Sequence, residues 1–340
     1  MTRAVVPRPH FTGPFGPALR QHLAVRRALG FALRNAEFEL AHFDHYVAKA
    51  WPAATTVTRA MVEDYFRTLS HLASGSRAIR LSHLRQFCRF LLADDPTTYL
   101  PERAFLPPAT SVIHPYIYSP EDVRAILQAA RRLPPAGSLR PVMYATLIGL
   151  LAVSGLRCGE ALRLDLVDVD LRAERLCVRT SKFRKSRLVP ITGSTAMALQ
   201  DYLLQRRRAG CAEHPTSPFF INQRGRRCDG YTVDYTYRTL LRGLPLITAQ
   251  GRTPRLHDFR HTFATTCAAH IASDRTSSGG SAEMDPTAGL AGLATYLGHS
   301  HFAHTQRYFH PQATTLETAS ARFRQHTLAA SSSGGPDATR

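Results

Sequence analysis

The sequence predicts a mainly α-helical protein with a small antiparallel β-sheet, organised as a helical N-terminal domain and a mixed α/β C-terminal domain. Apolar residues recur at helical spacing over most of the 340-residue chain. Residues 164–191 instead alternate in the manner of short strands around a basic turn. A segment with five prolines, 95–118, separates the two regions and is expected to be an interdomain linker. A chain of this length can bury a core in each of two domains.

The N-terminal region begins with residues 1–12, which lack periodicity and are expected to form a tail. Residues 13–94 then show the apolar spacing of about four helices, at positions that include Leu19, Leu23, Phe38, Leu40, Phe43, Val62, Phe66, Ile79 and Leu84. Basic side chains are frequent along these helices: Arg26, Arg27, Arg77, Arg80, Arg85 and Arg89. Taken alone, this is a basic helical bundle, in which most charges would form a solvated face.

The C-terminal domain, 119–329, opens with a clear helix start. Ser119 is a suitable N-cap, Pro120 suits the first helical position, and Asp122 brings an acid into the first turn. A helix at about 142–153 is almost entirely apolar, as expected at the centre of a large domain. The other expected elements are helices at 194–208, 231–242, 256–270, 286–297 and 315–328, a strand at 218–222, and a disordered Ser/Gly-rich tail at 330–340.

The charge balance points to a polyanionic partner. The net charge is +18 and the isoelectric point is about 10.4. This excess is larger than solubility requires, so we expect nucleic acid binding, with DNA as the obvious candidate. Only three of the 43 basic residues are lysines, and two of these, Lys182 and Lys185, lie in one turn. Because lysine can give up a proton whereas arginine keeps its own, a lysine retained there suits a proton donor.

Two other classes of protein are disfavoured. No apolar run reaches the roughly 18 residues that a membrane span needs, and the N-terminus has no apolar segment of signal-peptide length. We therefore expect a cytoplasmic protein without a membrane partner. The six cysteines form no C-x-x-C pair, which argues against a disulfide framework or a cysteine zinc site.

The candidate chemistry is organised around one stretch near the C-terminal end, L-G-H-S-H-F-A-H-T-Q-R-Y-F-H, which contains His299 and Tyr308. A tyrosine hydroxyl, with a pKa near 10, is a poor nucleophile while it is protonated. A catalytic tyrosine therefore needs cations and proton-transfer partners. We expect Tyr308 to be the nucleophile and its partners to come from elsewhere in the chain.

Three upstream motifs supply such partners. Arg157 lies in S-G-L-R-C-G-E, directly after the apolar helix. Lys182 lies in the basic turn T-S-K-F-R-K-S-R-L-V-P, between two expected strands and hence at a hairpin tip. His257 and Arg260 lie in H-D-F-R-H, three residues apart and therefore on one face if this segment is helical.

Each motif also has a plainer interpretation. Arg157 could form a simple ion pair with Glu160, three residues on. Lys185 competes with Lys182 for the role at the hairpin tip. A histidine beside an apolar helix, such as His299, is by default structural. For Arg157 and His299, the plainer interpretation would be the better one if the motif stood alone. The residues by themselves leave the choice between Lys182 and Lys185 open.

The main alternative for the H-D-F-R-H motif is a metal site, because His257 and His261 are four residues apart. Two features argue against it. Arg260 would bring a fixed cation beside the metal, and the motif lacks the glutamate that metalloproteases use as a base. We expect no bound metal.

Taken together and in this order, the four motifs resemble those of the tyrosine recombinase (phage integrase) family: G-L-R-x-x-E, a lysine before R-L-V-P, H-x-x-R, and L-G-H with a tyrosine nine residues beyond its histidine. The likeness covers about the last two thirds of the chain as motifs and the first third as domain layout. Cys158 departs from the usual aliphatic residue, and the interval between Arg260 and His299 holds extra sequence at 272–285. Neither departure removes a reactive group.

The resemblance implies a site-specific DNA recombinase with a core-binding domain at 13–94 and a catalytic domain at 119–329. In this family, the tyrosine attacks the scissile phosphate and leaves a 3′-phosphotyrosyl enzyme and a free 5′-hydroxyl. Because the phosphotyrosine retains the bond energy, no metal, nucleotide or other cofactor is required. The implied partners are double-stranded DNA with paired recombination sites, a homotetramer on synapsed DNA, and accessory recombination proteins.

The resemblance also assigns a role to each candidate residue beside Tyr308. Arg157 and Arg260 hold the non-bridging phosphate oxygens, and His299 assists them by hydrogen bonding. Lys182 protonates the leaving 5′-oxygen, and His257 handles the proton of the tyrosine hydroxyl.

Two other functions fit parts of the same pattern. A type IB topoisomerase shares this chemistry but swivels a single duplex, and the separate helical domain and long linker favour a recombinase over it. A non-catalytic DNA-binding relative would not be expected to keep all six polar residues.

Overall fold

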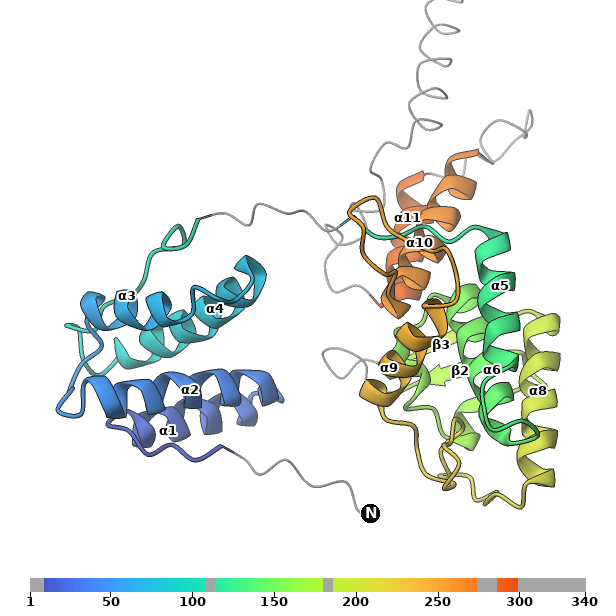
Figure 1. Ribbon diagram of the computed structural model, residues 1–340, viewed down its shortest axis with the longest axis horizontal. Helices are drawn as coiled ribbons and strands as arrows, with labels where there is room; N and C mark the ends of the chain where they lie inside the picture. The colour runs from blue at the N-terminus through green and yellow to red at the C-terminus, as the bar shows by residue number, and fades with distance from the viewer. Residues whose placement is uncertain (1–8, 108–113, 180–185, 274–285, 299–340) are drawn as a thin grey trace, which may run out of the picture. The chain divides into compact units, whose positions relative to one another are not determined.

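The computed structural model describes residues 9–107, 114–179, 186–273 and 286–298. The chain divides into two compact units, Met1–Ile113 and His114–Arg340. Both units are mainly helical in their described parts, and the second also holds a small antiparallel sheet (Figure 1). The predicted fold class is therefore confirmed.

The N-terminal unit has four helices within residues 9–107: α1 (Gly16–Ala28), α2 (Arg34–Ala50), α3 (Arg59–Thr68) and α4 (Ser74–Leu91). Each helix turns one apolar side towards a common core, in which Leu19, Phe43 and Phe87 are almost completely buried. Phe38 and Ile79 share the predicted helical spacing but are 44% and 55% exposed. A helix in a small bundle buries only one stripe, and these two residues lie beside it.

Residues 95–107 complete this unit. The backbone N–H of Tyr99 donates to the carbonyl oxygen of Val57 across 2.8 Å. The ring centroids of Phe105 and Phe66 are 5.4 Å apart, and Leu106 also packs on the core. Part of the segment expected to be a linker therefore contributes to the N-terminal core.

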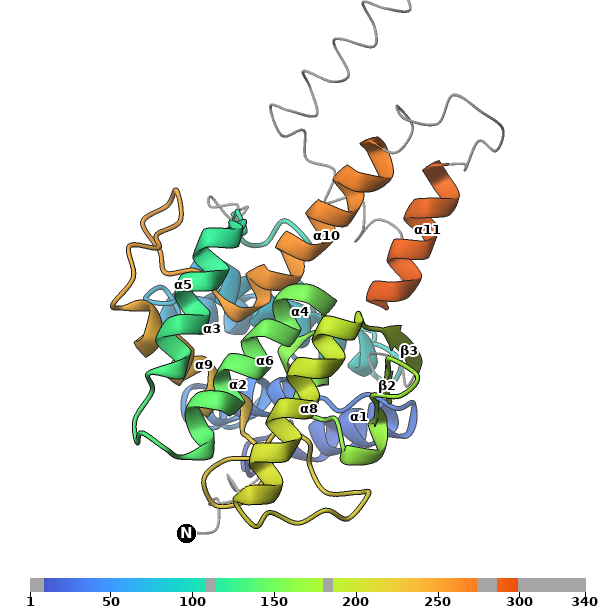
Figure 2. The same cartoon turned by 90° about the vertical axis from the view of Figure 1, so that its right-hand side faces the viewer.

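The C-terminal unit is mixed α/β. Its described elements are α5 (Pro120–Arg131), α6 (Leu139–Ser154), α7 (Cys158–Ala161), the 3₁₀ helix η1 (Leu166–Asp168), β1 (Val169–Asp170), β2 (Arg175–Val178), β3 (Arg187–Pro190), α8 (Gly193–Arg208), α9 (Gly230–Leu241), α10 (Leu256–Ser273) and α11 (Pro286–Leu297). Helix α6 packs against α5, α8 and α10 (Figure 2), which explains why its sequence is apolar on nearly every side. In the part of the chain that the structure describes, no helix is long and apolar enough to cross a membrane.

The predicted start of α5 is confirmed in detail. The Ser119 hydroxyl accepts a hydrogen bond from the Asp122 N–H across 3.1 Å, and the Asp122 carboxylate accepts one from the Ser119 N–H across 2.9 Å. Together they form a capping box, which satisfies two donors at the helix start.

The described sheet has the order β1-β2-β3, with both pairs antiparallel. Val178 at the end of β2 pairs with Arg187 at the start of β3, so the strands predicted on either side of the basic turn are confirmed. The prediction of a strand at 218–222 is wrong, because this segment forms isolated β-bridges and no ladder of strand pairs. It is held through the buried rings of Phe219 and Phe220, which pack against Tyr202.

Helices α10 and α11 lie side by side (Figures 1 and 2). Ala264 and Ala268 of α10 form a small apolar cluster with Leu293 and Leu297 of α11. Small residues on α10 allow the larger leucines of α11 to pack closely against it. This packing brings the end of α11 to the start of α10.

Candidate active site

Arg260, near the start of α10, is the central side chain of the candidate site and is only 1% exposed. Its Nη1 donates to the carbonyl oxygen of Gly155 across 2.8 Å, and its Nη2 donates to that of Leu297 across 2.6 Å. Gly155 lies two residues before Arg157, and Leu297 lies two residues before His299. One guanidinium therefore joins the backbone of three of the four motifs.

Gly155 makes this close approach of α6 and α10 feasible. Its φ angle is +57°, in the left-handed region that favours glycine. A Cβ atom at this position would lie 2.4 Å from the Cδ1 atom of Phe263 on α10. The glycine therefore ends α6, accepts the contact from α10 and turns the chain towards Arg157.

Arg157 forms the ion pair with Glu160 that the sequence suggested. The distance from Arg157 Nη1 to Glu160 Oε1 is 2.8 Å, and Glu160 Oε2 accepts a hydrogen bond from the Arg157 N–H across 3.1 Å. The Glu160 side chain is 1% exposed, whereas that of Arg157 is 30% exposed. The pair therefore orients a guanidinium that still reaches solvent, so the structural and functional interpretations are compatible.

Glu160 also binds Arg187 on β3, which was not among the residues predicted from the sequence. Burial alone would raise the pKa of Glu160, but the hydrogen bonds and charge of Arg187, followed by those of Arg157, lower it to about 2. Glu160 is therefore ionised at neutral pH. The sequence signal for Arg187 is its position as the arginine of R-L-V-P, directly after the basic turn.

His257 and His261 lie one turn apart on α10, with ring centroids separated by 4.9 Å. Desolvation, and then the charges of His261, Arg260 and Arg255, lower the pKa of His257 to about 4, although the residue as a whole is exposed to solvent. The ring is therefore neutral at pH 7 and can accept a proton. Among the residues that the structure describes, no group of three or more potential metal ligands occurs.

Lys182, His299 and Tyr308 lie outside the described residues, as does the competing Lys185. The structure therefore places His257 and Arg260 on the same helix and joins Arg260 to the backbone two residues before Arg157. The last described residue is Gly298, immediately before His299. Gly298 has a φ angle of +67°, and its N–H donates to the carbonyl oxygen of Thr295 across 3.0 Å.

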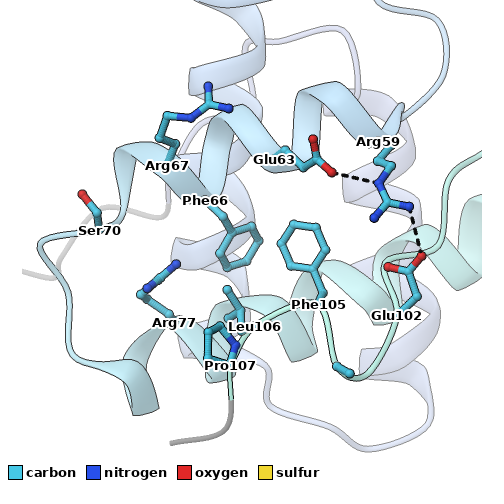
Figure 3. A pocket seen from close by; sticks show the side chains of 11 residues that line it. Arg59, Glu63, Phe66, Arg67, Ser70, Arg77, Glu102, Phe105, Leu106 and Pro107 are labelled. Carbon is cyan, nitrogen blue, oxygen red and sulfur yellow. Dashed lines mark hydrogen bonds and ion pairs between the residues drawn. The ribbon is translucent and has the colours of Figure 1, made fainter.

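A second surface of interest is a groove of about 640 Å³ on the N-terminal unit, between α3 and the segment 102–107 (Figure 3). Phe66, Phe105 and Leu106 form its apolar part. Its arginines are Arg59, Arg67 and Arg77. Arg59 donates hydrogen bonds to Glu63 and Glu102, which offsets part of the positive charge.

A smaller groove of about 430 Å³ follows α4 and is more strongly basic. Arg85, Arg89 and Arg103 line it, and its lining contains no carboxylate. Within the described residues, Nη1 of Arg85 is buried without a hydrogen-bond partner. Because three arginines and no carboxylate line this groove, it is a candidate surface for a polyanion.

The chain is similar to known proteins along most of its length. Residues 117–276 match the phage integrase family. The putative integrase/recombinase y4rB of Sinorhizobium fredii is 39% identical over 314 residues, which cover 91% of this chain and 96% of the relative. The tyrosine recombinase XerD of Caulobacter vibrioides is 30% identical over 254 residues, covering 73% of this chain and 75% of the relative.

Solved structures support the same fold. The structure of the Tn1549 transposon integrase in complex with circular intermediate DNA is similar, with a TM-score of 0.64 and 16% identity, over 89% of this chain and 98% of that one. Neither a type IB topoisomerase nor a non-catalytic relative is favoured by these matches. The relatives match most of the chain, and Arg260 is hydrogen-bonded to the backbone of the two motifs that contain Arg157 and His299. The chain therefore belongs to the phage integrase family and is a tyrosine recombinase, an enzyme that cleaves and rejoins DNA strands in site-specific recombination.

Proposed function

We propose that Tyr308 is the nucleophile of this recombinase. Its hydroxyl oxygen forms a bond to the scissile phosphorus while the bond from phosphorus to the 5′-oxygen breaks, which leaves a 3′-phosphotyrosyl enzyme and a 5′-hydroxyl. His257 takes the proton of the tyrosine, and Lys182 gives one to the 5′-oxygen. A 5′-hydroxyl from the partner duplex then reverses the step, so the energy of the phosphodiester is conserved.

In this proposal, Arg157 and Arg260 stabilise the charge on the non-bridging oxygens and His299 donates a hydrogen bond to them. Phosphoryl transfer is catalysed chiefly by positioning and electrostatic stabilisation, which prearranged cations supply. The observation that carries the proposal is the pair of hydrogen bonds from Arg260 to the carbonyl oxygens of Gly155 and Leu297. Those bonds join the backbone beside each of the three groups.

The proton-transfer role of His257 is compatible with its protonation state. A general base must be unprotonated at the working pH, and the lowered pKa of about 4 keeps His257 neutral at pH 7. The role of Lys182 is supported by the antiparallel pairing of Val178 with Arg187, because this pairing makes the intervening segment the connection of a hairpin.

The proposed substrate is double-stranded DNA with paired recombination sites, bound by a homotetramer on synapsed DNA. Accessory recombination proteins are further candidate partners. The two arginine-lined grooves of the N-terminal unit fit contacts to phosphates, which supply much of the affinity of proteins for DNA. The net charge of +18 agrees with this assignment.

A two-site strand-exchange assay tests the proposed function. Duplexes selected from a random pool for binding by the protein would be supplied as two distinguishable copies, and also within a supercoiled plasmid. We expect recombinant strands from the paired copies. Plasmid relaxation without exchange would instead indicate a topoisomerase, and binding with neither reaction would indicate a non-catalytic relative.

A further inference from the structure

Arg187 lies where three parts of the candidate active site meet. It is the first residue of β3, and its side chain is 12% exposed. Its Nη2 and Nη1 atoms lie 2.8 and 3.2 Å from the two carboxylate oxygens of Glu160. Its Nε donates to the carbonyl oxygen of Tyr296 on α11 across 2.8 Å. One side chain therefore links the sheet, a buried carboxylate and the C-terminal end of α11.

Glu160 extends this link to Arg157. The carboxylate that Arg187 binds with both terminal nitrogens also accepts hydrogen bonds from the Nη1 and the backbone N–H of Arg157. Because the carboxylate is buried, its orientation depends on the groups that bind it. Loss of Arg187 would leave Glu160 with one guanidinium partner in place of two, and would free both Glu160 and Arg157 to reorient.

The other contact of Arg187 acts on the end of α11. The last carbonyl groups of a helix have no partner within the helix, and here the carbonyl of Tyr296 is capped by Arg187. Gly298 follows with a φ angle of +67°, and a Cβ atom on it would lie 3.0 Å from Nη1 of Arg187. The glycine thus provides both the backbone turn and the room for this guanidinium, directly before His299.

We infer that Arg187 is a positioning residue, whose single guanidinium sets both the orientation of Arg157, through Glu160, and the direction in which the chain leaves α11 towards His299. Arg187 is assigned no contact with the reacting atoms. Its contribution therefore lies in the rate of cleavage at saturating DNA and not in DNA affinity. The inference rests on the proposed function, which gives Arg157 and His299 their roles.

Arg187→Lys is the informative variant. Lysine keeps a positive charge beside Glu160, but a single ammonium group cannot reproduce the planar fork that serves both Glu160 and Tyr296. We expect folding and DNA affinity close to those of the wild type, with cleavage of a nicked suicide duplex at saturating DNA slowed about 10- to 100-fold. Arg207→Lys is the matched control, because Arg207 is ion-paired with Glu213 at 2.7 Å but is 62% exposed on α8. It should cleave at the wild-type rate.

Cleavage by Arg187→Lys at the wild-type rate would overturn the inference. So would a variant that loses only DNA affinity, or one whose slower cleavage is explained by unfolding, as measured in urea. A wild-type protein that forms no covalent adduct would instead overturn the proposed function, and the inference with it. The two failures are therefore distinguishable in one experiment.

The pH dependence of Arg187→Met provides a second readout. Removal of Arg187 removes the first cation that lowers the pKa of Glu160 while burial persists, so the pKa of Glu160 rises. Glu160 holds Arg157 only while it is ionised. The variant should therefore lose cleavage as pH falls through a range in which the wild type does not, and His257, which titrates in both proteins, cannot cause the difference. Profiles of the same shape in both proteins would contradict the coupling.

Discussion

The Nη2 atom of Arg260 donates a hydrogen bond across 2.6 Å to the carbonyl oxygen of Leu297, the last residue of α11. The Nη1 atom of the same side chain binds the carbonyl of Gly155, at the end of α6. Because Arg260 is buried, water does not compete for these bonds. A residue assigned to the phosphate is therefore also a structural support, and its removal would disturb folding and catalysis together. Variants of other residues therefore separate the two effects better than variants of Arg260.

Gly155→Ala should both destabilise the protein and slow cleavage. The new Cβ would lie 2.4 Å from Phe263, and the φ angle of +57° is unfavourable for alanine. Gly210→Ala is the control, because Gly210 has a φ angle of +66° but nothing within 4 Å of its Cβ position. The control should cost about 1 to 2 kcal/mol of unfolding free energy, and Gly155→Ala about 1 to 3 kcal/mol more through overpacking. Urea unfolding measures both, and equal losses would argue against a close α6–α10 contact.

His257→Asn should slow cleavage about 10²- to 10⁴-fold at pH 7, as expected for loss of a general base. In the wild type, the lowered pKa of about 4 means that His257 does not titrate near its ordinary pKa of 6.5. Between about pH 4 and pH 6.5, His257 is protonated in the unfolded chain but neutral in the folded protein. The free energy of unfolding therefore decreases as pH falls from about 6.5 to about 4. Cleavage rates measured against pH at saturating DNA should show no His257 limb near pH 6.5. A limb there that disappears in His257→Asn would refute the neutral-base assignment.

The sequence predicted those features of the site that depend on residues close together in the chain. The pairing of Arg157 with Glu160 and the capping box of Ser119 with Asp122 each span three residues, so spacing alone indicates them. Arg187 could not be found in this way. Its partners Glu160 and Tyr296 lie 27 and 109 residues away, and only the folded chain brings them together.

The strand wrongly predicted at 218–222 shows what a local apolar pattern leaves open. The apolar run at 218–222 has the composition of a buried strand, but burial through Phe219 and Phe220 against Tyr202 does not require a ladder. Phe38 has helical spacing to other apolar residues, yet the bundle buries only one stripe of α2 and leaves this side chain exposed. In both cases, tertiary packing decided what the local pattern left open.

Lys182→Ala should slow cleavage of ordinary DNA about 10²- to 10⁴-fold if Lys182 is the general acid. Replacing the bridging 5′-oxygen by sulfur gives a better leaving group, so the variant should be largely rescued on this 5′-bridging phosphorothioate. Arg157→Ala is the control and should stay slow on both substrates, because Arg157 acts on the non-bridging oxygens. Rescue of Lys185→Ala in place of Lys182→Ala would move the acid to Lys185, and rescue of neither would leave this turn as a phosphate clamp.

Mapping of the covalent adduct tests the central claim most directly. Wild type and Tyr308→Phe would be incubated with a nicked suicide duplex in excess chelator, and the DNA-linked peptide would be identified by mass spectrometry. The account predicts a wild-type adduct on the peptide that contains Tyr308, and near-normal DNA binding without an adduct in Tyr308→Phe. An adduct in Tyr308→Phe, or one on Tyr231 or Tyr235, which are 79% and 59% exposed, would contradict it.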